Sequence, residues 1–194
     1  MNANFLSQMI AKKAMEQQDP SPGVSISNVP SLLKQYKTNN DRSVTALVIP
    51  SGIGAVNLEH LQNIPGVTIA KGIDKHYVSN DDSFEKFVNT VETIRPTLII
   101  AGSRGTELVT RFIKDYKGAI MILGGVHLSK LFETNPKNKI LLVHGSEDVN
   151  ERIKVVRGLA HKHKAKLVEA TTKGHDMSFD NKQTLVNLIQ YALQ

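Results

Sequence analysis

Residues 97–105 read Thr-Leu-Ile-Ile-Ala-Gly-Ser-Arg-Gly, and they are the most informative part of the chain. A short apolar run over 98–101 leads into a serine between small residues, and a segment with helical spacing, Thr106–Tyr116, follows directly. A sharp turn from a strand into a helix holds its central residue in a strained backbone conformation. Close neighbours of that residue must therefore be small, and here they are Ala101 and Gly105. The pattern predicts a buried strand, a tight turn that presents the serine hydroxyl, and a helix.

Two later turns place an acid and a histidine after predicted strands. Residues 139–148 read Lys-Ile-Leu-Leu-Val-His-Gly-Ser-Glu-Asp, and the continuous apolar run 140–143 is typical of a strand buried on both faces. Asp148 lies in the turn beyond that strand. The next predicted strand is 166–170, and His175 follows it in a loop. The order serine, aspartate, histidine differs from the order in the chymotrypsin and subtilisin triads.

Taken together, the three motifs resemble the α/β-hydrolase superfamily, in particular its small single-domain serine esterases and dienelactone-hydrolase-like members. The motifs are a nucleophile elbow at 102–105, the turn 144–148 and the turn 174–176, and the resemblance runs from about Ser43 to the C-terminus. It implies an α/β fold with a mostly parallel central sheet of about six strands, flanked by helices. The first strands of the family are expected to be reduced or absent, and the lid minimal. Ala101 is a mild departure, because the family usually has glycine there.

The resemblance also implies an activity, which is cleavage of carboxylic esters or thioesters through an acyl-enzyme intermediate. Ser103 would attack the carbonyl carbon, His175 would accept and return the proton, and Asp148 would orient the imidazole. The expected partner is a small-molecule ester substrate. No metal and no other cofactor is expected.

Further contacts with the substrate are implied at the rim of the same site. The oxyanion of the intermediate would be held by the backbone N–H of Arg104 and by that of Gly52 or Ile53. The loop 50–54 reads Pro-Ser-Gly-Ile-Gly and lacks the His-Gly-Gly start that is common in the family. His127, which follows two glycines and a valine, is a candidate substrate-binding residue.

Simpler interpretations of the same residues stay open at this point. Ser103 could cap the helix that follows it, and His175 could be a histidine of a surface loop. Asp148 could be the N-cap of the next helix, in which case Glu147 or Asp176 could be the acid.

Two other classes of function also remain. One is a catalytically silent α/β-hydrolase fold that acts as a binding or regulatory module, suggested by Ala101 and by the unusual loop 50–54. The other is a phosphate or nucleotide site at the glycines of 102–105, although the longer glycine fingerprints of such sites are absent.

Length and composition exclude several alternatives. The chain has 194 residues, the size of one domain, and we divide it into an N-terminal segment of helix plus loop, 1–42, and an α/β-hydrolase domain, 43–194. It has no cysteine, which excludes disulfides and thiol chemistry. The net charge is +6, but the positive residues are scattered and aromatics make up 5%, so nucleic-acid binding is not expected. Because no apolar run approaches the roughly 20 residues of a membrane span and 1–17 lacks the apolar core of a signal peptide, a cytoplasmic protein without stable membrane insertion is expected. The sequence does not indicate an oligomeric state.

Hydrophobic periodicity gives the expected elements. Strands are expected at 44–49, 67–70, 98–101, 119–123, 140–143 and 166–170. Helices are expected at 56–63, 83–94, 106–116, 126–132, 149–163 and 182–193. A further amphipathic helix is expected at 2–17, and 24–27 could be a short strand.

Overall fold

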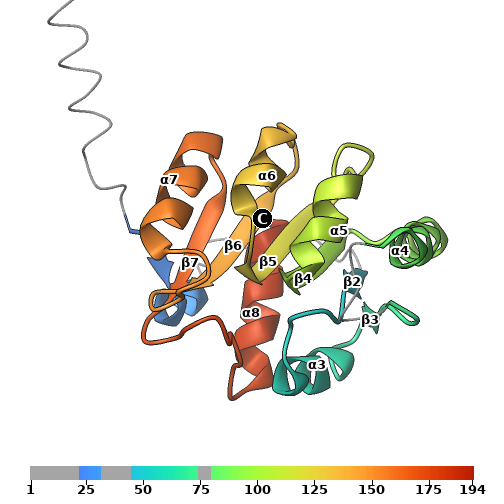
Figure 1. Ribbon diagram of the computed structural model, residues 1–194. Helices are drawn as coiled ribbons and strands as arrows, with labels where there is room; N and C mark the ends of the chain where they lie inside the picture. The colour runs from blue at the N-terminus through green and yellow to red at the C-terminus, as the bar shows by residue number, and fades with distance from the viewer. Residues whose placement is uncertain (1–21, 32–44, 74–79) are drawn as a thin grey trace, which may run out of the picture.

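Seven strands form the centre of the structure, a computed structural model that describes residues 22–31, 45–73 and 80–194 (Figure 1). Every described pair of strands is parallel, and the order across the sheet is β1-β7-β6-β5-β4-β2-β3. The strands are β1 (Val24–Ser25), β2 (Ala46–Val48), β3 (Val67–Ile69), β4 (Leu98–Ser103), β5 (Ala119–Gly125), β6 (Ile140–Gly145) and β7 (Lys166–Ala170).

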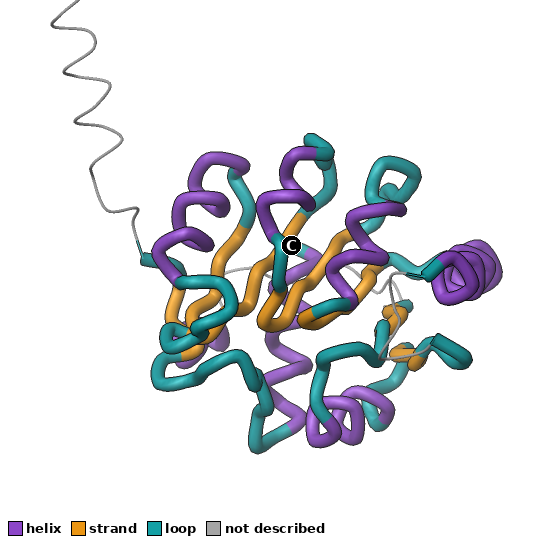
Figure 2. The backbone as a smooth tube through the Cα atoms, viewed as in Figure 1, coloured by secondary structure: helices purple, strands orange, loops and turns teal. Residues whose placement is uncertain are grey.

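Helices cover both faces of this sheet, as Figures 1 and 2 show. One face carries α4 (Asp81–Ile94), α5 (Gly105–Phe112), α6 (Leu128–Glu133) and α7 (Ile153–His163). The other face carries α3 (Ala55–Gln62), α8 (Lys182–Leu193) and the short 3-10 helix η1 (Ile26–Asn28). None of the helices in the described part of the chain is both long and apolar enough to cross a membrane.

Apolar side chains of the central strands divide alternately between the two faces. Along β4, for example, Ile99 and Ala101 pack into the core under α4–α7, whereas Leu98 and Ile100 pack into the core above α3 and α8. Strands that are buried on both faces need apolar residues at every position, which is why these strands read as continuous hydrophobic runs. The carboxyl ends of all the strands consequently open at one edge, where a parallel sheet of this kind places its ligands.

The expected sheet of about six mostly parallel strands is confirmed, and a seventh strand, β1, is added at the edge next to β7. The helix expected over 149–163 begins at Ile153 instead, because the backbone N–H groups of Asn150 and Glu151 bind the carboxylate of Asp148 in a turn. The helix expected over 106–116 ends at Phe112. The helix expected over 2–17 lies outside the described residues.

A buried carboxylate joins the first strand to the last. Glu169 of β7 accepts two hydrogen bonds from Arg157 of α7, at 2.9 Å from Nε and 2.7 Å from Nη2, and a third from the backbone N–H of Gly23. The hydrogen bonds from Arg157 keep the pKa of Glu169 below its ordinary value, although burial opposes this by raising the pKa. The ionised form of Glu169 therefore stabilises the folded protein and holds β1 in the sheet.

Replacement of this carboxylate, Glu169→Gln, is expected to lower the free energy of unfolding by about 1–3 kcal/mol at neutral pH. Because the folded pKa of Glu169 lies below its ordinary value of 4.5, this contribution is complete above that pH and disappears as the pH falls through the folded pKa. Urea unfolding at pH 7 and at pH 3 should therefore show a difference between wild type and variant that shrinks at the lower pH. Asp82→Asn, which removes an exposed ion pair with Lys86, is the control. A difference that is equal at both pH values would contradict the assignment.

Candidate active site

Ser103 stands on a strained turn at the carboxyl end of β4. Its φ is +44°, in the left-handed region, and Arg104 returns to the right-handed helical region with φ −62° as α5 begins. A β-carbon on Gly102 would lie 3.0 Å from the carbonyl oxygens of Gly52 and Leu123, so the residue before the serine has no room for a side chain. The conformation costs on the order of 1–3 kcal/mol and is kept by the packed surroundings. It turns the serine hydroxyl out of the sheet.

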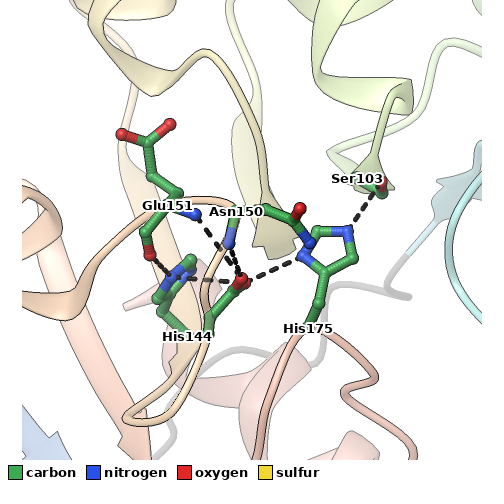
Figure 3. A network of polar contacts seen from close by, with 6 residues as sticks. Ser103, His144, Asn150, Glu151 and His175 are labelled. Atoms are coloured by element: carbon green, nitrogen blue, oxygen red, sulfur yellow. Dashed lines mark hydrogen bonds and ion pairs between the residues drawn. The ribbon is translucent and has the colours of Figure 1, made fainter.

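His175 lies between Ser103 and Asp148 and makes a hydrogen bond with each (Figure 3). Its Nδ1 is 2.8 Å from Oδ2 of Asp148, and its Nε2 is 2.9 Å from Oγ of Ser103. An ionised carboxylate can only accept, so Nδ1 carries the proton. The unprotonated Nε2 is then free to accept the hydrogen bond of the serine hydroxyl. This is the arrangement in which a histidine can act as a base toward a serine.

The carboxylate of Asp148 is fully buried and collects several donors. Its Oδ1 accepts from the backbone N–H of Asn150 at 2.8 Å and of Glu151 at 3.4 Å, while Oδ2 faces His175. Burial acts to raise the pKa of Asp148, but the hydrogen bonds from His175 and Asn150 and the nearby imidazoles outweigh it, so the pKa is lowered. Asp148 therefore stays ionised to a lower pH than an exposed aspartate would.

Two loops that carry Asp148 and His175 run against each other beyond β6 and β7. The backbone N–H of Ser146 donates to the carbonyl of Ala170 at 3.1 Å, and that of Glu147 to the carbonyl of Lys173 at 2.9 Å. A β-carbon on Gly145 would lie 2.2 Å from the carbonyl oxygen of Lys173. The loops can approach this closely only because position 145 has no side chain.

We expect Gly145→Ala to destabilise the protein by about 1–3 kcal/mol and to remove the contact between the two loops. The added methyl would overlap backbone atoms of Lys173 and Gly174, which cannot yield as the end of a flexible side chain could. His175 follows directly, so we also expect a loss of about 10²-fold in any activity that depends on its position. Gly158→Ala in α7 is the matched control, because nothing lies within 4 Å of its new methyl and the helix should gain stability. Equal effects of the two substitutions in thermal unfolding would contradict this explanation.

The loop 50–54 packs directly against the serine. Gly52 has φ +70°, and a β-carbon on it would lie 2.2 Å from the β-carbon of Ser103. Ile53 is buried beside Gly102, while the side chain of Arg104 is exposed at the start of α5. The three residues expected to supply backbone N–H groups to an oxyanion, Arg104, Gly52 and Ile53, therefore all adjoin Ser103.

Asn57, which the sequence did not single out, fixes this loop to the loop that follows His175. It is completely buried, and its amide nitrogen donates to the carbonyls of Ile53 at 2.9 Å and Met177 at 2.8 Å. Its Oδ1 accepts from the backbone N–H of Phe179 at 3.0 Å. One signal was available in the sequence: a polar residue on the inner face of an amphipathic helix needs buried partners.

Comparisons with known proteins agree on the fold. No family model matches the sequence, and no curated protein does. A serine hydrolase homologue from Coxiella burnetii aligns over 80% of this chain and 86% of its own, with a TM-score of 0.56 and 13% identity. The esterase domain of a Rhodothermus marinus protein aligns over 78% and 86% (TM-score 0.53, 14% identity), and a predicted CIB-like hydrolase from Thermoplasma acidophilum over 78% and 87% (TM-score 0.56, 15% identity). The chain has the α/β-hydrolase fold.

Within this α/β-hydrolase fold, the simpler interpretations of the site residues do not describe the geometry. The side chain of Ser103 binds His175, and α5 has Arg104 at its N-cap without a side-chain cap. Asp148 is not the cap of α7, whose N-cap is Arg152. The carboxylate of Asp176 binds Ser178 rather than His175.

His127 lies apart from the three hydrogen-bonded residues of the α/β-hydrolase site. It is exposed, has φ +55° and stands at the N-cap of α6. A shallow cavity of about 270 Å³ between α5 and α6 is lined by His127 together with Glu107, Thr110, Arg111, Val126 and Lys130. Gly125, two residues before His127, pairs with Ser103 across the sheet, which puts this cavity near the serine. Across 22–31, 45–73 and 80–194, no cluster of three or more His, Cys, Asp or Glu side chains could hold a metal ion.

Proposed function

We propose that the protein is a serine hydrolase that cleaves carboxylic esters or thioesters through an acyl-enzyme intermediate. Its strongest support is the unbroken line of hydrogen bonds from Asp148 through His175 to Ser103, made by three residues far apart in the sequence. The line ends on a residue with a strained, left-handed backbone at the carboxyl edge of a parallel sheet. Strain of this kind persists only where the surrounding packing enforces it, and it gathers at functional sites.

In the first half of the reaction, Oγ of Ser103 attacks the carbonyl carbon of the ester while Nε2 of His175 takes the hydroxyl proton. The proton then passes from His175 to the leaving alcohol or thiol, which departs and leaves an acyl group on Ser103. A water molecule reverses these steps, giving up a proton to His175 and releasing the carboxylic acid. Asp148 stays ionised throughout and stabilises the imidazolium that forms twice in each cycle.

The negative oxygen of each tetrahedral intermediate would be held by backbone N–H groups. Arg104 supplies one and Gly52 or Ile53 the other in this proposal, since these residues surround Ser103. One such donor is worth roughly 3–4 kcal/mol in the transition state of an acyl transfer. Glycine at position 52 suits this role, because any side chain there would overlap the serine.

Small soluble esters are the substrate class that we propose. Only α6 and its flanking turns stand between β5 and β6, so no long insertion encloses the serine. His127 and the shallow cavity beside it would contact one end of the substrate. Turnover of p-nitrophenyl acetate and butyrate should therefore exceed that of the dodecanoate and palmitate esters. Much faster hydrolysis of the long-chain esters would contradict this substrate class.

Labelling with a fluorophosphonate probe tests the activity itself. The folded protein should react, and mass spectrometry of the digested product should find the adduct on Ser103 and not on another serine. Protein unfolded in urea before the reaction is the control, because labelling requires the histidine beside the serine. Absence of both labelling and ester turnover in folded protein would favour a catalytically silent fold that binds a partner.

A further inference from the structure

His144 is buried beside Asp148, and no step of the proposed reaction uses it. It is the next-to-last residue of β6, its exposed fraction is 1%, and it lies one turn of chain before the carboxylate. Its Nε2 is 2.6 Å from the backbone carbonyl of Glu151 and 3.4 Å from Oδ2 of Asp148 (Figure 3). A buried imidazole of this kind is kept for its hydrogen bonds, since a hydrophobic side chain would fill the same space without a cost of desolvation.

The partner of His144 determines which of its nitrogens carries a proton. A backbone carbonyl can only accept a hydrogen bond, so Nε2 of His144 must be the donor to Glu151. The same N–H is close enough to Oδ2 of Asp148 to lower the energy of its negative charge. The turn 148–151 is thus closed from both sides, by Oδ1 of Asp148 on two backbone N–H groups and by His144 on the carbonyl.

We propose that His144 is a positioning residue, which acts through Asp148 to hold that carboxylate at Nδ1 of His175 and to limit how strongly it attracts the His175 proton. This inference rests on the proposed serine hydrolase activity. Without the His144 N–H, the negative charge of Asp148 would be shared with fewer donors and would act more strongly on His175. His175 would then become protonated at a higher pH, and the turn would have more freedom to move.

Other charged groups around Asp148 and His175 are already accounted for by partners. Glu169 pairs with His144 across β6 and β7, but its carboxylate is held by Arg157 and Gly23. Asp176 binds Ser178. A change in the protonation of His175 after substitution of His144 would therefore report on the contact between His144 and Asp148.

Substitutions that differ only in the donor test the inference. His144→Leu and His144→Met remove it, whereas His144→Gln keeps an amide N–H near the position of Nε2. NMR titration of the ring protons of His175 should show a midpoint that moves to higher pH by about half a pH unit or more in the Leu and Met variants. The Gln variant should stay near wild type. His161→Leu, at an exposed position of α7, is the matched control and should change nothing.

Kinetics of ester hydrolysis should follow the same order. The Leu and Met variants should lose about 10-fold to 100-fold in kcat with little change in KM, because the substrate does not touch His144. The acid limb of their kcat/KM profile should move to higher pH, and the Gln variant should recover most of both changes. A loss of stability alone, without the shift in pH, would show that His144 only supports the fold and would overturn the inference.

A measurement on the wild type keeps the inference testable if the variants fail to fold. Nitrogen-15 chemical shifts of the His144 ring should identify Nε2 as the protonated nitrogen near neutral pH, and a proton on Nδ1 alone would overturn the inference. Neither this measurement nor the titration needs catalysis. An inactive wild type with the expected His144 and His175 behaviour would therefore refute the hydrolase proposal and leave the contact standing, whereas an active enzyme with unchanged variants would do the opposite.

Discussion

Ser103→Ala is expected to reduce kcat for p-nitrophenyl acetate on the order of 10⁶-fold, to the level of residual binding and oxyanion stabilisation. The substitution removes the only atom that can form the acyl-enzyme and leaves His175 without the hydroxyl at 2.9 Å from its Nε2. The fold should be unchanged by circular dichroism, because the lost contact is one hydrogen bond of a half-buried side chain. Substantial turnover by the variant would show that another group attacks the ester.

A second variant at the same position separates chemistry from strain. Ser103→Gly should be as inactive as Ser103→Ala but more stable, by up to about 1 kcal/mol, because glycine adopts φ near +44° without the steric cost that alanine keeps. The gain is limited by the greater freedom of glycine in the unfolded chain. Thermal unfolding of both variants measures the difference. A less stable glycine variant would mean that the turn is not strained in the way that its φ indicates.

Much of this architecture was predictable because parallel strands buried on both faces leave a strong signal. The runs 98–101, 119–123, 140–143 and 166–170 are apolar at nearly every position, and each of them is a strand. Helix boundaries were predicted less well where side chains compete with the backbone. The start of α7 is the example, since Asp148 takes the N–H groups that a helix beginning at 149 would need.

The topology at the edge of the sheet was outside the reach of sequence patterns. β1 has only two residues, and its place beside β7 depends on the hydrogen bond from Gly23 to Glu169, a residue 146 positions away. Neither half of that contact is conspicuous alone. A glutamate near the end of an apolar strand indicates a buried partner, but it does not say which one.

For the site, residue types and their order predicted which side chains meet, because all three follow strand ends of one sheet. What the sequence could not supply was the set of residues that hold these side chains in place. Asn57, Gly145 and His144 act through backbone contacts between loops, and their partners are carbonyl and N–H groups that every residue possesses. Such partners become visible only when the loops are seen together.

Asp148→Asn is expected to lower kcat by about 10⁴-fold with a smaller effect on KM. The turn 148–151 dictates this result, because the backbone N–H groups of Asn150 and Glu151 require an acceptor at the position of Oδ1. The amide would therefore place its oxygen there and its NH₂ group toward Nδ1 of His175. His175 would have to accept at Nδ1 and carry its proton on Nε2, where it opposes the hydroxyl of Ser103.

The opposite orientation of the amide is closed to the variant. It would restore a proper acceptor for His175, but it would turn the NH₂ group toward two backbone N–H donors in a buried site, at a cost of about 1–3 kcal/mol for each group left without a partner. Asp176→Asn is the matched control, since that carboxylate binds Ser178 and not His175, and its activity should stay within a few-fold of wild type. Equal losses in the two variants would mean that Asp148 is not the acid that orients His175.

Stability of the Asp148→Asn variant should also depend on pH in a defined direction. The folded pKa of Asp148 lies below its ordinary value of 3.8, so in the wild type its ionised form stabilises the fold above that pH, and the contribution is lost as the pH falls through the folded pKa. The amide variant has no such titration. The free energies of unfolding of the two proteins, measured from pH 7 to pH 2, should therefore differ most at neutral pH and converge in acid. Curves that stay parallel over this range would show that the carboxylate of Asp148 is not held by the donors that surround it here.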